Sequence, residues 1–194
     1  MSRIVAGIRR GQKLTMPTHR RTRPTSDRVR EAAFSLIADW AGTAGEPAET
    51  MLHRFSFLDL FGGSGAVSCE AASRGAGPVV CVERDRGTAA IARRNAEDVD
   101  LEVQVVASSV EQFLAGEATP FDVVWMDPPY DAPGYAVDQL VERVVSGGWL
   151  ADDGLVVVER SARVDPPVWP KRLSSSRARR YGETTLYLAS KEPL

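Results

Sequence analysis

From residue 55 onward, short apolar runs alternate with stretches in which apolar residues recur three and four positions apart. The runs predict buried strands, and the second spacing predicts helices because it places apolar side chains on one helical face. The predicted strands cover 55–61, 79–83, 103–107, 121–126 and 155–159, and the predicted helices cover 64–73, 88–96, 110–114 and 135–145. Such alternation is typical of a parallel sheet with right-handed crossovers. We therefore expect an α/β fold with a doubly wound, Rossmann-like layer.

The C-terminal pattern differs, because two strand-like segments follow one another without a helix between them. They cover 177–181 and 184–189, and the dipeptide Gly182-Glu183 separates them. A two-residue connection that contains glycine is typical of a β-hairpin. We expect this hairpin to close the sheet with an antiparallel edge, which gives a seven-stranded, mostly parallel sheet.

The segment before the sheet predicts a small hairpin and a helix. Ser26 is suited to cap a helix, and Asp27 would lie in its first turn, where a negative charge is favourable. The apolar positions of this helix fall on one stripe, namely Val29, Ala33, Ile37 and Trp40. The glycines within 4–14 favour a small hairpin ahead of the helix, and 41–54 reads as a connecting loop.

Composition bounds the size of the protein and its surroundings. A chain of 194 residues with 43% hydrophobic residues can bury one core and is too short for two ordinary domains. We divide it into an N-terminal extension over 1–50 and a main domain over 51–194. Cys69 and Cys81 lie in apolar segments, and no signal peptide or membrane-spanning run is present. The sequence thus predicts a cytoplasmic protein with reduced thiols, no metal site and no membrane contact.

Charge is distributed unevenly. Residues 1–30 carry nine Arg and Lys residues against one acid, whereas the rest of the chain carries 15 against 25. Arginine binds phosphate oxygens through its planar guanidinium group, so a basic arm on an acidic body predicts a nucleic-acid partner, although a solubilising terminus would share this composition. The candidate RNA-binding residues are Arg3, Arg9, Arg10, Lys13, Arg20, Arg21, Arg23 and Arg28. A second basic cluster comprises Lys171, Arg172, Arg177, Arg179 and Arg180.

The first predicted strand ends in a glycine-rich turn that suggests a bound cofactor. Glycines at a strand-to-helix turn permit positive φ angles and close approach of a ligand, and the amides of the following helix attract anions. A turn that is merely tightly packed would look the same in sequence. The cofactor candidates in this turn are Asp59, Gly62, Gly63, Ser64 and Gly65.

Polar residues also follow the next two strands. Glu83 ends the second strand, where an acid can accept hydrogen bonds from both ribose hydroxyls. Ser109 follows the third strand, where its hydroxyl could contact an adenine or cap the next helix. These features predict a nucleoside cofactor without choosing between a dinucleotide and S-adenosylmethionine.

The sequence Asp127-Pro128-Pro129-Tyr130 follows the apolar strand 121–126 and favours S-adenosylmethionine. Two prolines cannot continue a sheet ladder, so the strand ends here with an acid, a carbonyl and an aromatic ring. A carboxylate and a backbone carbonyl that accept the two N–H bonds of an exocyclic amine would direct its lone pair at a methyl sulfonium. The ring of Tyr130 could stack on an extruded base. These four residues are therefore the catalytic candidates.

Together these stretches resemble the bacterial small-subunit ribosomal RNA guanine-N2 methyltransferases of the RsmD type, within the class I S-adenosylmethionine-dependent fold. The resemblance extends from about Arg3 to Leu188. The matching stretches are Arg3-Ile4-Val5-Ala6-Gly7 with Arg10-Gly11, Arg23-Pro24-Thr25 with Asp27-Arg28-Val29-Arg30-Glu31, Asp59 through Gly65, Glu70-Ala71 with Ser73-Arg74-Gly75-Ala76, and Asp127 through Tyr130.

The resemblance implies that the glycine turn and Glu83 bind S-adenosylmethionine, that 127–130 form the target pocket and that the N-terminal arm grips RNA. It further implies methylation of the exocyclic N2 of a guanine in 16S ribosomal RNA, either naked or in an assembly intermediate of the small subunit, by a monomeric enzyme. This chain departs from the family pattern at Ser109, where an acid or amide is common, and in its longer loop 41–54. The competing hypotheses are an amino-methyltransferase acting on DNA or protein and a noncatalytic RNA-binding assembly factor.

Overall fold

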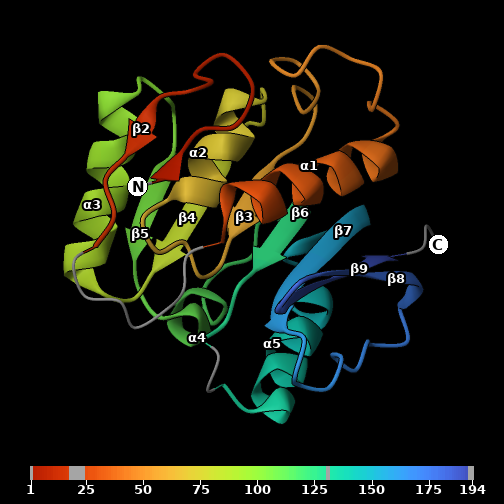
Figure 1. The fold of residues 1–194 in the computed structure, drawn as a ribbon. Helices are drawn as coiled ribbons and strands as arrows, with labels where there is room; N and C mark the ends of the chain where they lie inside the picture. Colours follow the sequence, from red (N-terminus) through yellow and green to blue (C-terminus); the bar gives the residue numbers. More distant parts are fainter. Residues whose placement is uncertain (1, 18–24, 130–131, 192–194) are drawn as a thin grey trace.

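A seven-stranded mixed sheet forms the centre of the molecule (Figure 1). The computed structural model describes residues 2–17, 25–129 and 132–191. The strand order is β5-β4-β3-β6-β7-β9-β8, in which β9 runs antiparallel to both of its neighbours. The strands are β3 (Phe57–Asp59), β4 (Val79–Glu83), β5 (Gln104–Ala107), β6 (Phe121–Met126), β7 (Leu150–Ser161), β8 (Leu173–Tyr181) and β9 (Thr184–Lys191).

Helices cover both faces of the sheet, which confirms the predicted α/β fold (Figure 1). One face packs against α4 (Val110–Phe113) and α5 (Gly134–Ser146). The other packs against α1 (Asp27–Ala41) and α2 (Ala66–Ser73), with α3 (Arg86–Asp98) beside α2. Because the central strands are buried on both sides, they read in the sequence as nearly continuous apolar runs.

Local sequence signals account for the ends of α1. The side chain of Ser26 accepts a hydrogen bond from the Val29 amide at 3.3 Å, which confirms it as the N-cap. The helix stops at Gly42, whose φ of 70° lies in the left-handed region that favours glycine. The apolar stripe faces the sheet, and Phe34 and Ile37 are fully buried.

The predicted hairpin at the C-terminus is present, and its second strand, not its first, pairs with β7. Strand β9 pairs with β7 and lies inside the sheet, whereas β8 forms the outer edge. The apolar residues Leu186 and Leu188 of β9 are buried, while most of the polar strand β8 is exposed. Burial therefore explains why the later strand is the inner one.

The N-terminal extension contains the small hairpin expected from the sequence. Its strands β1 (Ser2–Arg3) and β2 (Lys13–Leu14) pair with each other and not with the main sheet. Ile4 and Leu14 are buried with Cys69 of α2 and Ala96 of α3, so the hairpin shares a core with the helices. It is held in place as a packed element rather than a free arm.

The carboxylate of Glu70 in α2 secures this extension. It accepts hydrogen bonds from the amides of Val5 at 2.7 Å and Ala6 at 2.9 Å. It also pairs with the buried guanidinium groups of Arg30 at 3.3 Å and Arg74 at 2.9 Å. The Glu70 carboxylate thus compensates the two buried guanidinium charges, which would otherwise be costly inside the protein. Arg30, which contributed to the basic arm in the sequence, is consequently fully buried.

Candidate functional site

Four carboxylates lie at the ends of neighbouring parallel strands. Asp59 ends β3 and Glu83 ends β4, while Asp127 directly follows β6 and Glu159 lies near the end of β7. Asp59 pairs in register with Trp125, and Met126 pairs with Val158, so Asp127 and Glu159 are the next step along their strands. Ligands of open α/β sheets bind at this carboxyl edge.

Asp59 is a buried acid with an unused hydrogen-bonding atom. The residue is only 2% exposed, and its Oδ2 accepts a hydrogen bond from Ser68 Oγ at 2.7 Å. Its Oδ1 has no partner among the described residues. Burial raises the pKa of Asp59 to about 7, and the neighbouring Glu83 charge adds to this shift, although bonds from Ser68 and Phe61 oppose it. A buried carboxyl group with one oxygen left without a partner suits a cationic ligand.

Asp127 and Glu159 form a second acidic pair. Glu159 is 4% exposed, and its Oε2 accepts a hydrogen bond from Thr25 Oγ1 at 2.7 Å. Removal from water, followed by the charges of Glu159 and Asp59, raises the pKa of Asp127 well above its usual range. Burial likewise raises the pKa of Glu159 to about 7, against the lowering effects of Thr25 and Arg30. Each negative charge disfavours ionisation of the other, so the two carboxylates titrate as a coupled pair with raised pKa values.

The glycine turn between β3 and α2 serves packing at some positions and access at another. A Cβ at Gly62 would meet Cys81 Sγ at 2.1 Å, so this glycine lets the turn pack on β4. Gly63 has a φ of 52°, and a Cβ there would meet no atom within 4 Å. Gly63 is therefore the position at which a ligand can approach the backbone, and Gly62 is explained by packing.

Glu83 is bound to this turn in the structure. Its Oε2 accepts a hydrogen bond from the Gly63 amide at 2.9 Å, and its Oε1 accepts one from the Asp85 amide at 2.8 Å. The carboxylate thus fixes the relative positions of the glycine turn and the end of β4. Both oxygens keep a second lone-pair site for further donors.

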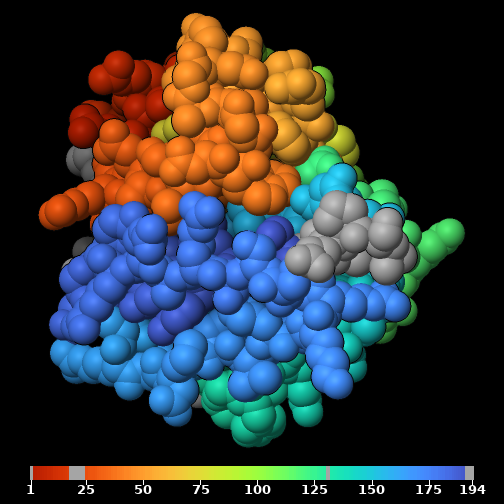
Figure 2. Space-filling model, turned by 90° about the vertical axis from the view of Figure 1, so that its right-hand side faces the viewer, coloured from red at the N-terminus to blue at the C-terminus, as the bar shows by residue number. Residues whose placement is uncertain are grey.

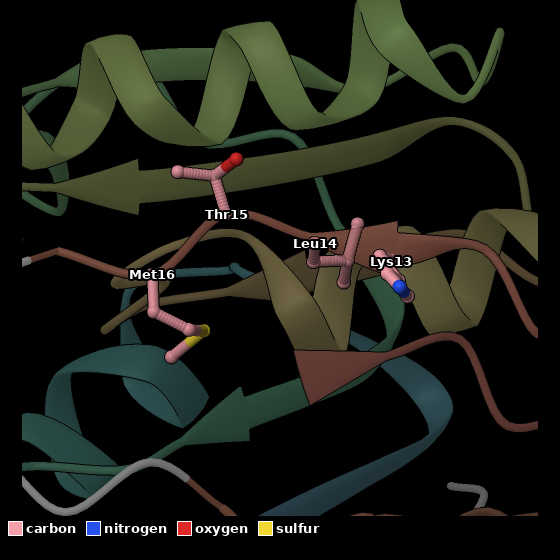
Figure 3. A pocket seen from close by; sticks show the side chains of 4 residues that line it. All are labelled: Lys13, Leu14, Thr15 and Met16. Atoms are coloured by element: carbon pink, nitrogen blue, oxygen red, sulfur yellow. The ribbon is translucent and has the colours of Figure 1, made fainter. Parts of the chain in front are cut away.

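The N-terminal hairpin reaches the glycine turn. Asn95 of α3 donates hydrogen bonds to the Ser64 carbonyl at 2.8 Å and the Thr15 carbonyl at 2.9 Å, and it accepts one from the Thr15 amide at 2.8 Å. Ser64 Oγ also donates to Met16 Sδ at 3.4 Å. The segment 13–16 lines a pocket of about 310 Å³, in which Thr15 and Met16 point to opposite sides (Figure 3). The extension is therefore connected directly to the candidate cofactor site.

Ser109 acts as a helix cap in the structure. Its side chain accepts a hydrogen bond from the Gln112 amide at 3.2 Å at the start of α4. The sequence left its role open between capping and adenine contact, and the capping bond is the one that the geometry shows. Its hydroxyl proton is still free to reach a base.

Comparison with known proteins identifies the family. The family model described as "Conserved hypothetical protein 95" matches residues 2–190. Ribosomal RNA small subunit methyltransferase D of Escherichia coli (strain K12) is 32% identical over 191 residues, which cover 98% of this chain and 90% of that protein. The chain belongs to the RsmD family.

Solved structures agree with this assignment to the RsmD family. The structure of yhhF from Escherichia coli is 30% identical, covers 99% of this chain and 98% of its own, and superimposes with a TM-score of 0.83. An RNA methyltransferase from Salinibacter ruber in complex with S-adenosyl-L-homocysteine gives a TM-score of 0.62 at 17% identity, with 88% of this chain and 94% of that chain covered. At that identity the second likeness shows a shared fold.

The arm that the RsmD resemblance assigns to RNA divides into exposed and engaged residues. Arg10, Lys13 and Arg28 are exposed. Arg3 is exposed but pairs with Asp27 at 3.3 Å, and the half-buried Arg9 pairs with Asp100. The remaining candidates Arg20, Arg21 and Arg23 lie outside the described residues, as does the catalytic candidate Tyr130.

The second basic cluster lies on the exposed edge strand β8 and the turn before it. Figure 2 shows the blue C-terminal part of the chain, which includes β8 and β9, directly beside the orange helix α1. Arg177, Arg179 and Arg180 are exposed there, and no ion pair among the described residues involves them. This edge therefore adds uncompensated positive charge to the RsmD-family surface.

Sequence reasoning missed Glu159 and Thr25. Glu159 occupies the end of a predicted strand, so the rule that selected Glu83 could have found it. Thr25 belongs to the stretch Arg23-Pro24-Thr25 that resembles the family, but that resemblance assigned it no role. Its contact with Glu159 spans 134 residues and depends on the tertiary fold.

The described residues form neither a metal centre nor a membrane-spanning helix. Across residues 2–17, 25–129 and 132–191, no group of three or more His, Cys, Asp or Glu side chains is arranged to hold a metal ion. Over the same ranges, none of the helices has the length and apolar character that crossing a bilayer requires. Both cysteines are buried and free, and burial raises the pKa of Cys69 to about 12.

Proposed function

We propose that this protein transfers a methyl group from S-adenosylmethionine to the exocyclic N2 of a guanine in 16S ribosomal RNA. The observation that carries the proposal is the position of Asp127-Pro128 directly after β6, whose neighbouring strands β3 and β7 bring Asp59 and Glu159 to the same edge of the sheet. Membership of the RsmD family supports the reaction class, and the printed names of its relatives support ribosomal RNA as the substrate.

The residues present fit S-adenosylmethionine. When bound, this cofactor supplies an electrophilic methyl group on a positively charged sulfur. The unpartnered Oδ1 of buried Asp59 offers an acceptor to a cationic group, and the open backbone at Gly63 permits close approach. Glu83 lies beside that turn and can accept hydrogen bonds from ribose hydroxyls. We propose that Ser109, which caps α4 by accepting from the Gln112 amide, donates its hydroxyl proton to the adenine.

Asp127 and Pro128 act on the acceptor amine. The Asp127 carboxylate and the Pro128 carbonyl accept the two N–H bonds of the exocyclic amine, which holds its lone pair toward the methyl carbon. With S-adenosylmethionine bound, methylation would make the amine nitrogen more acidic, and Asp127 would accept the proton that this nitrogen loses. Burial, followed by the charge of Glu159, raises the pKa of Asp127, so the ionised carboxylate is a stronger base toward the amine proton. Tyr130 is proposed to stack on the guanine.

Two basic surfaces are available to hold the RNA. The hairpin presents Arg10 and Lys13, and the sheet edge presents Arg177 and Arg179. Contacts of this kind with phosphates position a substrate without reading its sequence. Arg3, Arg9 and Arg28 remain candidates as well, together with Arg20, Arg21 and Arg23. We propose that a cytoplasmic monomer acts on 16S ribosomal RNA or on an assembly intermediate of the small subunit.

The reaction is tested by mapping methylated nucleosides in ribosomal RNA. Cells that lack this protein should lose one N2-methylguanosine from 16S ribosomal RNA, and the purified protein should restore it. Asp127→Asn should lower kcat by about 10²- to 10³-fold because one charged acceptor is lost, while calorimetry shows nearly unchanged binding of S-adenosylmethionine. Glu142→Gln on the exposed side of α5 is the matched control. Transfer at the parent rate by Asp127→Asn would contradict the proposed role.

A further inference from the structure

A pocket whose wall begins a few residues after Asp127 has no role in the site described above. It lies between the start of α5 and the segment that connects β7 to β8, and it has a volume of about 580 Å³. Figure 1 shows both segments at the lower end of the molecule, where the strands of the parallel sheet end. Ala132, five residues after Asp127, belongs to its wall. The pocket therefore adjoins the acceptor site on the α5 face of the sheet.

Arg160 gives this pocket a buried hydrogen-bond donor. It follows Glu159 in β7, so its side chain lies on the opposite face of the sheet. Arg160 is 6% exposed, and its Nη2 donates to the Ala132 carbonyl at 3.2 Å. Its Nη1 is buried and has no hydrogen-bond partner among the described residues. Burial lowers the pKa of Arg160, which indicates a cation that is poorly solvated. An unpaired buried donor of this kind is uncommon and is costly to maintain.

The rim of the pocket combines apolar and aromatic side chains with the charged residues Arg163 and Asp165. Only three large hydrophobic residues of the described chain are markedly exposed, and two of them, Tyr135 at 68% and Val168 at 69%, belong to this rim. Pro166 and Pro167 complete it. Asp138 is also present, but its Oδ1 accepts a hydrogen bond from the Val168 amide at 2.9 Å and so holds the rim in place. Flat apolar surfaces beside a buried donor match the face and the edge of a nucleobase.

The first turn of α5 supplies a place for a phosphate. Helix α5 begins at Gly134 after Pro133, and Pro133 makes no side-chain capping bond. The free amides at the start of a helix attract anions. Gly134 has open space at its Cα, since a Cβ there would meet no atom within 4 Å.

We propose that this pocket binds the nucleotide that flanks the methylated guanine in the RNA strand. Its base stacks on Tyr135 and hydrogen-bonds to Arg160 through a carbonyl or ring-nitrogen acceptor, and its phosphate lies at the start of α5. Guanine, with the adjacent acceptors O6 and N7, fits an arginine best. The proposal rests on the function proposed above. It adds a second contact with the RNA, which selects the sequence and holds the strand beside Asp127 and Pro128.

Kinetics with two variants test the subsite. The substrates are small ribosomal subunits and protein-free 16S ribosomal RNA from cells that lack this protein. Tyr135→Ala changes an exposed side chain and should raise KM for the RNA substrate about tenfold, because stacking of one base is worth on the order of 1 to 3 kcal/mol. Arg160→Lys keeps the positive charge but loses the planar guanidinium group with its paired N–H donors, so it should raise KM by a similar factor. In both variants kcat should stay within about twofold, and S-adenosylmethionine should bind as in the parent.

Arg143→Ala is the matched control, because Arg143 is an exposed arginine in the last turn of the same helix. The subsite would be refuted if Tyr135→Ala left KM unchanged, or if it lowered kcat with KM unaltered. Ultraviolet cross-linking of the parent protein to small subunits separates the possible occupants. A nucleotide attached to the peptide around Tyr135 supports the proposal, and a ribosomal protein attached there overturns it.

A binding assay separates this proposal from the reaction itself. Labelled 16S ribosomal RNA is titrated with each variant in the presence of S-adenosylhomocysteine. If the parent methylates no RNA but Tyr135→Ala still weakens RNA binding about tenfold, the subsite stands and the proposed reaction fails. If the parent forms N2-methylguanosine and both variants bind and react as the parent does, the subsite alone fails.

Discussion

At the scale of single residues, the pair formed by Asp127 and Glu159 should set the pH dependence of the reaction. Asp127 accepts an N–H bond of the amine only when its carboxyl group is ionised, so the rate should rise as the pH rises through the raised pKa of Asp127. Glu159→Gln removes a like charge that raises the pKa of Asp127, so the rising limb should move toward lower pH. Thr25→Val removes a hydrogen bond that lowers the pKa of both acids, so the limb should move toward higher pH.

Single-turnover rates measured from pH 5.5 to 8.5 test both shifts. RNA and cofactor are used at saturating concentrations, so that the dependence of the rate on pH reflects the reaction and not binding. A limb that moves in the same direction in both variants would show that Glu159 does not act through the pKa of Asp127. Glu111→Gln, in an exposed position of α4, controls for a general effect of removing a negative charge.

The positions of single residues were predictable where the apolar pattern located the end of a strand. Asp59, Glu83 and Asp127 follow or end strands that the apolar pattern located, and the structure brings them to one edge. Their protonation could not be predicted, because the pKa of Asp59 depends on burial and on neighbours from other strands. Gly62 was grouped with a ligand turn, although its lack of a side chain accommodates Cys81. Sequence spacing does not distinguish these two uses of glycine.

At the scale of elements, Glu70 joins the N-terminal hairpin to α1 and α2. Glu70→Gln would keep an acceptor for the hairpin amides, but it would remove the ion pair of buried Arg74 and leave buried Arg30 with Asp27 as its remaining acidic partner. Breaking such a network costs about 3 to 5 kcal/mol, so urea unfolding should show a loss of that size. Trypsin should also cleave faster within residues 2–17. A loss below about 1 kcal/mol would contradict this account; Glu111→Gln is again the control.

The order and type of the elements were predictable, and their exact pairing was not. Apolar runs located β4 and β6 to the residue, because Glu83 and the prolines after Met126 mark their ends. Strand β7 begins at Leu150, earlier than the predicted residue 155, because its first part is polar and joins the sheet through an irregular register. Which strand of the C-terminal hairpin pairs with β7 depends on burial of Leu186 and Leu188, a tertiary effect.

At the scale of the whole molecule, the buried acids should make stability fall as pH rises. Asp59 and Glu159 have usual pKa values of 3.8 and 4.5 and folded values of about 7. Between about pH 4 and 7 the folded state therefore keeps protons that the unfolded chain has released, and the free energy of unfolding decreases with pH across that window. Asp59→Asn removes one such group and should stabilise the protein at pH 8 by about 2 to 4 kcal/mol relative to the parent.

Urea unfolding at pH 5.5 and pH 8 checks the sign and the size of this effect. The parent should be more stable at the lower pH, and Asp59→Asn should show a smaller difference between the two conditions. Equal differences for parent and variant would mean that Asp59 is already ionised in the folded protein. Asp122→Asn is a poor control because Asp122 bonds Ser56, so exposed Asp153→Asn is used.

The distribution of charge over the molecule predicts two separate RNA contacts. Each phosphate contact that is lost should reduce the slope of log Kd against log salt by about 0.7 to 0.9. Arg10→Glu with Lys13→Glu tests the hairpin, and Arg177→Glu with Arg179→Glu tests β8. Either double variant should therefore reduce the slope by about 1.4 to 1.8. Arg9 is left intact because its ion pair with Asp100 holds the hairpin against the body.

The two surfaces belong to different parts of the fold, the hairpin beside α2 and α3 and the strand at the opposite edge of the sheet. Their effects should therefore add in the quadruple variant, as expected for sites that share no partners. Arg143→Glu, at the far end of α5, should leave the slope unchanged. If the β8 variant also left it unchanged, the RNA would contact the hairpin side alone, and the positive charge of the edge strand would need another explanation. If every slope fell equally, the control included, the effect would be one of net charge and not of contact.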